Sequence, residues 1–145
     1  MPKPPLHELV AGKLAEILLQ QVPKQFKVRR EAPLTFKDSE PEPDISVLKG
    51  DWDDWQANHP STASLVVEVA ITSEALDMTK AEIYAEAGIA EYWLVRPEHR
   101  SVEVHRKPGR HGYKATRSFH EDETLKCASI VSVEFKVASI FPSRS

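Results

Sequence analysis

The chain has 145 residues, a formal net charge of -3 and an apolar content of 41%. This length suits one compact domain over residues 1–145, with a core of its own and no room for a second domain. No apolar run approaches the roughly 18 residues that a membrane-spanning helix needs, and the lone Cys127 excludes an internal disulfide framework. We therefore expect a cytoplasmic protein without membrane contact. Its acidic balance argues against a strong general attraction to nucleic acid.

The first half of the chain predicts one helix followed by two strands. Apolar residues at helical spacing predict an opening helix over residues 6–20, which Pro23 ends. Alternation of apolar and charged residues predicts a strand over 26–36 that Pro33 interrupts. A polar, proline-bearing turn then leads to a second strand over 44–48.

The second half continues the alternation of strands and helices. A strand over 64–71 leads through Thr72 and Ser73, as a helix cap, into a helix over 74–87 that Gly88 ends. Further strands are expected at 91–95, in a hairpin at 101–106 and 113–119, and at the sheet edge within 130–141. The order helix, strand, strand, strand, helix, strand, with extra C-terminal strands, indicates an α/β fold with a mixed central sheet flanked by helices.

A carboxylate stands inside the most apolar of these strands. Glu68 is flanked by residues 65–67 and 69–71, a run of the kind found in strands that are covered on both faces. Burying an unpaired charge is costly, so Glu68 needs a cation or a proton. Asp44, at the start of the preceding strand, supplies a second carboxylate. Lys80 lies on the apolar stripe of the following helix, from which its ammonium can reach the sheet.

Two carboxylates and a lysine beside a sheet can hold a divalent cation and steady a phosphate. Mg²⁺, or Mn²⁺ in its place, is typically bound by one or two carboxylates and keeps several waters. Such an ion activates a water and neutralises phosphoryl oxygens, while a lysine stabilises the transition state. We interpret Asp44 and Glu68 as metal ligands and, together with Lys80, as catalytic residues. Asp77, one turn before Lys80, is an auxiliary candidate.

Each of these residues also has a structural interpretation. An aspartate after proline is commonly a turn residue, which is the alternative for Asp44. Glu68 alone is compatible with one half of a buried ion pair. Lys80 alone is compatible with a side chain that extends along the helix surface to solvent.

The motifs taken together resemble a known family. They are Pro41-Glu-Pro-Asp44, Leu65-Val-Val-Glu-Val69, Asp77-Met-Thr-Lys80 and Ala87-Gly-Ile-Ala-Glu-Tyr-Trp-Leu-Val95. In this order they resemble the Uma-two family, a bacterial branch of the PD-(D/E)XK restriction-endonuclease-like superfamily. The resemblance implies a restriction-endonuclease-like core. It also implies a Mg²⁺- or Mn²⁺-dependent endonuclease that hydrolyses phosphodiester bonds, with DNA as the expected partner.

The sequence departs from the family pattern in three places. The superfamily's usual lysine, two residues after the strand glutamate, is replaced by Ala70; this family moves the lysine to the helix, so that Lys80 serves instead. Arg96 stands where relatives usually have an acid. The N-terminal hairpin of many relatives is missing. Glu8, near the start of the opening helix, is a further candidate ligand, with a solvated helix-start glutamate as the alternative.

Two hypotheses of different classes follow. The first is an active metal-dependent endonuclease, which the presence of Asp44, Glu68 and Lys80 favours. The second is a catalytically silent nuclease-fold module that binds nucleic acid or oligomerises, for example as a homodimer. The acidic balance and the lack of a dense basic cluster favour this second hypothesis. A hydrolase of a phosphoester other than nucleic acid is a third. The sequence does not discriminate DNA from RNA.

Overall fold

The structure is a computed structural model that describes residues 3–71 and 74–144, without the side chains of residues 74–77. Its longer elements are α1 (Pro5–Gln21), β1 (Phe26–Arg30), β2 (Ile45–Lys49), β3 (Leu65–Val69), α2 (Glu74–Glu86), β4 (Glu91–Arg96), β5 (Ser101–Gly109), β6 (Gly112–His120), β7 (Thr124–Lys126) and β8 (Glu134–Lys136). Short 3-10 helices are η1 (Trp52–Trp55), η2 (Pro97–His99) and η3 (Val137–Ile140). The predicted order of helices and strands and the α/β class are confirmed. Among the described residues, no helix has the length and apolarity that crossing a membrane requires.

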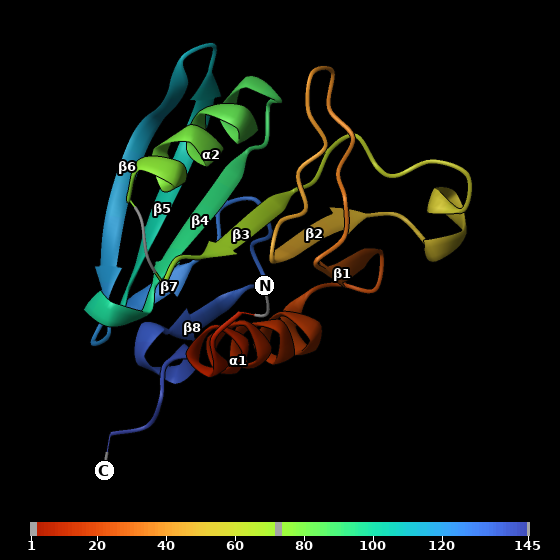
Figure 1. The fold of residues 1–145 in the computed structure, drawn as a ribbon. Coiled ribbons are helices and arrows are strands. Elements are labelled where there is room, and N and C mark those ends of the chain that lie inside the picture. The colour runs from red at the N-terminus through yellow and green to blue at the C-terminus, as the bar shows by residue number, and fades with distance from the viewer. Residues whose placement is uncertain (1–2, 72–73, 145) are drawn as a thin grey trace.

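Within the described residues, six strands form one mixed sheet whose spatial order, β1-β2-β3-β4-β5-β6, follows the chain (Figure 1). The pair β3 and β4 is parallel, and the other neighbouring pairs are antiparallel. Parallel neighbours need a crossover connection, and α2 provides it. This connection places α2 over the face of the sheet next to β3, the strand that carries Glu68.

Each face of the sheet has its own apolar core, because side chains alternate between the two faces of a strand. On one face, α1 and the C-terminal segment pack over residues such as Val67 and Trp93. On the other, α2 packs over residues such as Val66 and Leu94 (Figure 1). Glu68 has the parity of Val66, and its carboxylate therefore faces the α2 side.

The first strand is shorter than predicted. Sequence alternation predicted a strand over 26–36, whereas β1 ends at Arg30. Glu31 has a φ of 48°, a left-handed conformation that ends the extended run, and Pro33 has no N–H to donate to a neighbouring strand. The segment that follows returns to the sheet at Asp44, whose carbonyl accepts a hydrogen bond from the Glu31 N–H at 3.2 Å.

The prediction that a C-terminal strand pairs with the edge of the main sheet is also wrong. β8 pairs with β7 in a separate two-stranded sheet and does not extend the main one. The reason is burial: Leu125 and Phe135 from this small sheet join the α1-side core, and the Phe135 ring lies 5.7 Å from the Trp93 ring. The small sheet closes one face of the main sheet. The proposed cap at Thr72 and Ser73 lies outside the described residues.

A buried carboxylate on β4 binds the segment that connects β7 and β8. Glu91 is 1% exposed, and its Oε1 accepts hydrogen bonds from the N–H groups of Ala128 and Ser129, each at 2.9 Å. Its Oε2 accepts from Trp93 Nε1 at 2.7 Å and from Arg106 Nη2 at 3.3 Å. Four donors offset the cost of burying this charge.

We expect Glu91→Ala to lower the free energy of unfolding by about 3 kcal/mol, because it leaves buried donors and a guanidinium without their acceptor. Urea unfolding followed by circular dichroism measures this change. Glu134→Ala, which removes a carboxylate from a side chain that is 55% exposed, is the matched control and should change stability by less than about 0.5 kcal/mol. Equal effects of the two substitutions would contradict an anchoring role for Glu91.

Candidate functional site

Asp44, directly before β2, lies beside Glu68 of β3. β2 and β3 are antiparallel with Ile45 opposite Val67, and the same register puts Asp44 opposite Glu68. The Asp44 N–H donates to Glu68 Oε1 at 3.3 Å, and the Val69 N–H donates to Asp44 Oδ2 at 2.7 Å. The two residues are 3% and 5% exposed, respectively. The sheet thus buries two adjacent carboxylates, as the sequence predicted.

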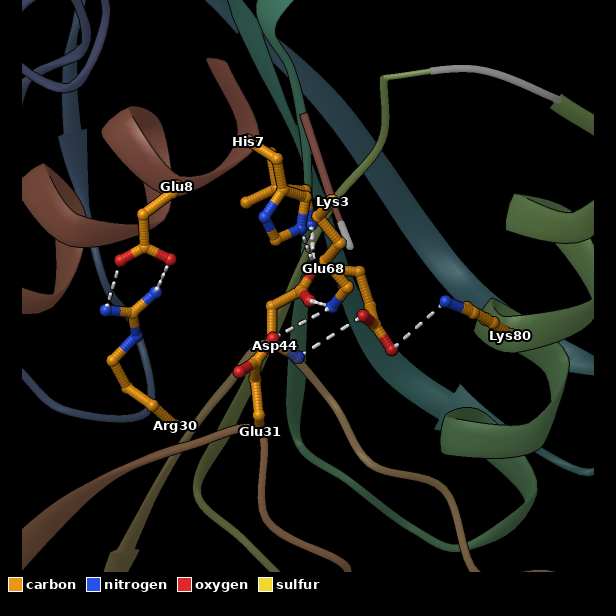
Figure 2. A network of polar contacts seen from close by, with 9 residues as sticks. Lys3, His7, Glu8, Arg30, Glu31, Asp44, Glu68 and Lys80 are labelled. Atoms are coloured by element: carbon orange, nitrogen blue, oxygen red, sulfur yellow. Dashed lines mark hydrogen bonds and ion pairs between the residues drawn. The ribbon is translucent and has the colours of Figure 1, made fainter. Parts of the chain in front are cut away.

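α2 supplies the partners of Glu68. The Tyr84 hydroxyl donates to Oε2 at 2.8 Å. The Lys80 ammonium lies 3.6 Å from the same oxygen (Figure 2). The prediction that Lys80 points towards the carboxylates is confirmed. Its side chain is 49% exposed, however, so Lys80 lies at the border of the apolar stripe and not within it. Lys80 connects the buried carboxylate with solvent.

The N-terminal segment and α1 supply the partners of Asp44. Lys3 Nζ donates to Asp44 Oδ1 at 2.5 Å and lies 3.3 Å from Glu31 Oε1 (Figure 2). His7 Nε2 lies 3.1 Å from Asp44 Oδ2. The imidazole of His7 is buried, and its Nδ1 has no hydrogen-bond partner among the described residues. Both oxygens of Asp44 are therefore in contact with nitrogen atoms.

Sequence reasoning missed Lys3 and His7. A signal for His7 exists: it lies one helical turn before Val10 and Ala11 on the buried stripe of α1, and a histidine on an apolar stripe needs a polar partner. No comparable signal marks Lys3, which precedes the helix. Its contact with Asp44 depends on the assembled fold.

The two auxiliary candidates have different outcomes. Glu8 does not join the carboxylate pair, because its Oε1 and Oε2 accept hydrogen bonds from Arg30 Nη1 and Nη2, each at 2.9 Å (Figure 2). The neighbouring His7 makes the contact of α1 with Asp44. The side chain of Asp77 lies outside the described part of the chain.

The environment moves the pKa values of the two acids apart. Burial, followed by the charge of Asp44, raises the pKa of Glu68 from 4.5 to about 7, against the opposing effects of Lys80 and Tyr84. Burial also acts to raise the pKa of Asp44, but the hydrogen bonds from Lys3 and the Val69 N–H outweigh it, and the pKa falls below its usual range. Asp44 is thus ionised at neutral pH, whereas Glu68 titrates close to it.

The donor set fits a hard divalent cation held largely by water. In the described part of the chain, no three acids, histidines or cysteines form a metal-ligating cluster. Mg²⁺ commonly needs only one or two carboxylates, because it retains several waters. Asp44 and Glu68 meet this requirement in number and type, and Asp44 Oδ1 is already paired with the Lys3 ammonium. Burial and then the charge of Asp44 raise the pKa of Glu68, so a cation bound there would favour its ionised form.

We expect Glu68→Gln to stabilise the metal-free protein by an amount on the order of 1 kcal/mol at about pH 8. The amide keeps the size of the side chain and removes a charge that burial and Asp44 both disfavour. A carboxyl whose pKa is raised on folding costs stability as the pH rises from 4.5 to about 7. The gain should therefore be absent below this window and complete above it.

Thermal melting of both proteins across this pH range measures the difference. Glu82→Gln, on the exposed side of α2, is the control and should show no such pH dependence. A Glu68→Gln protein less stable than wild type at about pH 8 would mean that the charge is a satisfied partner of Lys80 and Tyr84.

Comparison with known proteins agrees with the fold. The sequence pattern of the Uma2 family, described as "Putative restriction endonuclease", matches residues 1–139. A crystal structure described as a "putative nuclease belonging to DUF820", from Anabaena variabilis, superposes with a TM-score of 0.77 at 19% identity. The superposition covers 97% of this chain and 82% of that one. No curated protein matches. The chain belongs to the Uma2 family, the family that its sequence motifs resemble.

Proposed function

We propose that this protein is a metal-dependent endonuclease that hydrolyses phosphodiester bonds of nucleic acid, with DNA as the expected substrate. Asp44 and Glu68 would hold Mg²⁺ or Mn²⁺, and Lys80 would act with them on the phosphate. The observation that carries the proposal is a pair of adjacent, buried carboxylates, the kind of oxygen ligands that a hard divalent cation takes. Membership of the Uma2 family supports a nuclease-type hydrolase.

The protein side chains prepare this site by orienting its oxygens. The Val69 N–H and His7 fix Oδ2 of Asp44, while the Tyr84 hydroxyl fixes Oε2 of Glu68. Asp44 and Glu68 would hold the divalent ion, which when bound would supply an activated water and neutralise phosphoryl charge. Fixed ligands of this kind avoid reorganisation during the reaction.

Lys80 is suited to contact the substrate. Its ammonium is 3.6 Å from Glu68, yet half of the side chain is exposed. The ammonium can therefore stay near the carboxylates and meet a phosphate that approaches from solvent. The usual lysine position is occupied by Ala70, which is uncharged, and Lys80 of α2 supplies the positive charge instead. Asp77 remains an auxiliary candidate from its place one turn before Lys80.

The expected setting follows from the chain as a whole. We propose a cytoplasmic enzyme that binds DNA at the carboxylate site. The net charge of -3 provides no overall electrostatic attraction to the DNA backbone. A bound divalent ion would reduce local repulsion of the phosphate backbone. A homodimer would offer a second surface for the duplex.

We expect Asp44→Asn to weaken Mn²⁺ binding by at least about tenfold, because it replaces an ionised ligand with a neutral one. Calorimetric titration of Mn²⁺ into the metal-free proteins measures this loss. Cleavage of a DNA duplex in Mg²⁺ should be lost in parallel. Asp38→Asn, in the exposed turn after β1, should leave both properties unchanged.

The titration also separates the two classes of function. A wild-type protein that binds no Mn²⁺ and cleaves no nucleic acid would contradict the endonuclease and favour the silent nuclease-fold module. In that case Lys3 and Lys80 would be permanent counter-ions of the two carboxylates.

A further inference from the structure

An ammonium from the start of the chain lies on the candidate metal ligand. Lys3 Nζ is 2.5 Å from Asp44 Oδ1 and 3.3 Å from Glu31 Oε1. The side chain of Asp44 is 4% exposed, whereas those of Lys3 and Glu31 are 45% and 54% exposed. Lys3 therefore reaches a buried carboxylate from the solvent side, where a substrate would also arrive.

The two oxygens of Asp44 have different kinds of partner. Oδ2 is held by the Val69 N–H and by His7, which belong to β3 and α1 and are fixed by the fold. Oδ1 is held by Lys3, which precedes α1. Oδ1 is thus the oxygen whose partner can leave while the sheet and the helix stay in place.

The structure allows Lys3 to move independently of α1. The helix begins at Pro5, and its N-cap, Pro4, is extended with φ -60° and ψ 154°. Proline fixes φ and is well tolerated at the start of a helix. The backbone next to Lys3 is therefore held, and its four-carbon side chain can turn without any change in the helix. Glu31 offers this ammonium a second, exposed partner beside the site.

We propose that Lys3 is a substrate-contacting residue of the nuclease site, which rests on Asp44 until a divalent ion binds there and then contacts the phosphate of the substrate. The inference rests on the proposed function. A divalent ion on Asp44 repels an ammonium at 2.5 Å from the same carboxylate. The displaced ammonium remains tethered beside the site, where an incoming phosphate provides new negative charge.

This arrangement would give each carboxylate of the pair a lysine of its own. Lys80 approaches Glu68 from α2, and Lys3 approaches Asp44 from the N-terminal segment (Figure 2). Two ammonium groups that come from different elements can contact different oxygens of one phosphodiester or its neighbouring phosphate. The second lysine would supply part of the positive charge that the acidic surface lacks.

The proposal predicts two changes of opposite sign in Lys3→Met. Removing the competing ammonium should tighten Mn²⁺ binding roughly three- to tenfold, in line with a partly exposed ion pair. Removing the phosphate contact should weaken binding of a DNA duplex in Ca²⁺ by a similar factor. Calorimetry measures the first change and fluorescence anisotropy the second, with intact DNA confirmed on a gel.

Two variants serve as controls. Lys3→Arg keeps the positive charge and should retain DNA binding, while Lys37→Met removes an exposed lysine after β1 and should change neither affinity. Tighter Mn²⁺ binding together with weaker DNA binding in Lys3→Met alone would support the proposal.

Other outcomes overturn it in distinguishable ways. If wild type and Asp44→Asn differ in Mn²⁺ affinity but Lys3→Met matches wild type in both assays, Lys3 is only a structural partner of Asp44. Weaker Mn²⁺ binding in Lys3→Met would mean that Lys3 orients the ligand, which also contradicts displacement. If wild type binds no Mn²⁺, the proposed function fails and this inference fails with it.

Discussion

The structure depends on burying two like charges next to each other. The register of β2 and β3 puts Asp44 opposite Glu68, and both carboxylates are almost completely removed from water. Charges buried in this way must be paired, protonated or bound to a cation. The surrounding elements provide for this need: α2 brings Lys80 and Tyr84 to one carboxylate, and the segment around α1 brings Lys3 and His7 to the other.

A second buried glutamate in the same sheet shows how a purely structural carboxylate is treated. Glu91 receives three N–H donors and the Arg106 guanidinium. Glu68 accepts a hydrogen bond from the Tyr84 hydroxyl and a longer one from the Asp44 N–H, and the Lys80 ammonium lies 3.6 Å away. The charge of the neighbouring Asp44 carboxylate disfavours its ionised form. The fold therefore gives Glu91 a full set of close donors, whereas Glu68 has fewer and lies beside a second carboxylate. Incomplete compensation of this kind is typical of sites that bind or react.

The sequence predicted the parts of the fold that local patterns encode. Helical spacing located α1, and the apolar run around Glu68 located β3 together with its buried acid. The end of β1 was missed because Glu31 adopts a left-handed φ, which the pattern of side chains does not predict. The pairing of β8 with β7 was missed because it depends on burial against Trp93. Lys3 was missed for the same reason: its partner is 41 residues away, and only the assembled fold brings them together.

These separations have a consequence for folding. The site joins residues that are 41, 24 and 16 positions apart along the chain, whereas β5 and β6 are consecutive strands joined by a tight turn. Contacts between distant residues must first overcome the entropy of closing a long loop, so they form later than local hairpins. The polar centre is therefore completed only after the sheet and both helices have come together. A ligand that needs the complete centre would discriminate finished molecules from partly folded ones, and its binding would slow unfolding of the finished molecules.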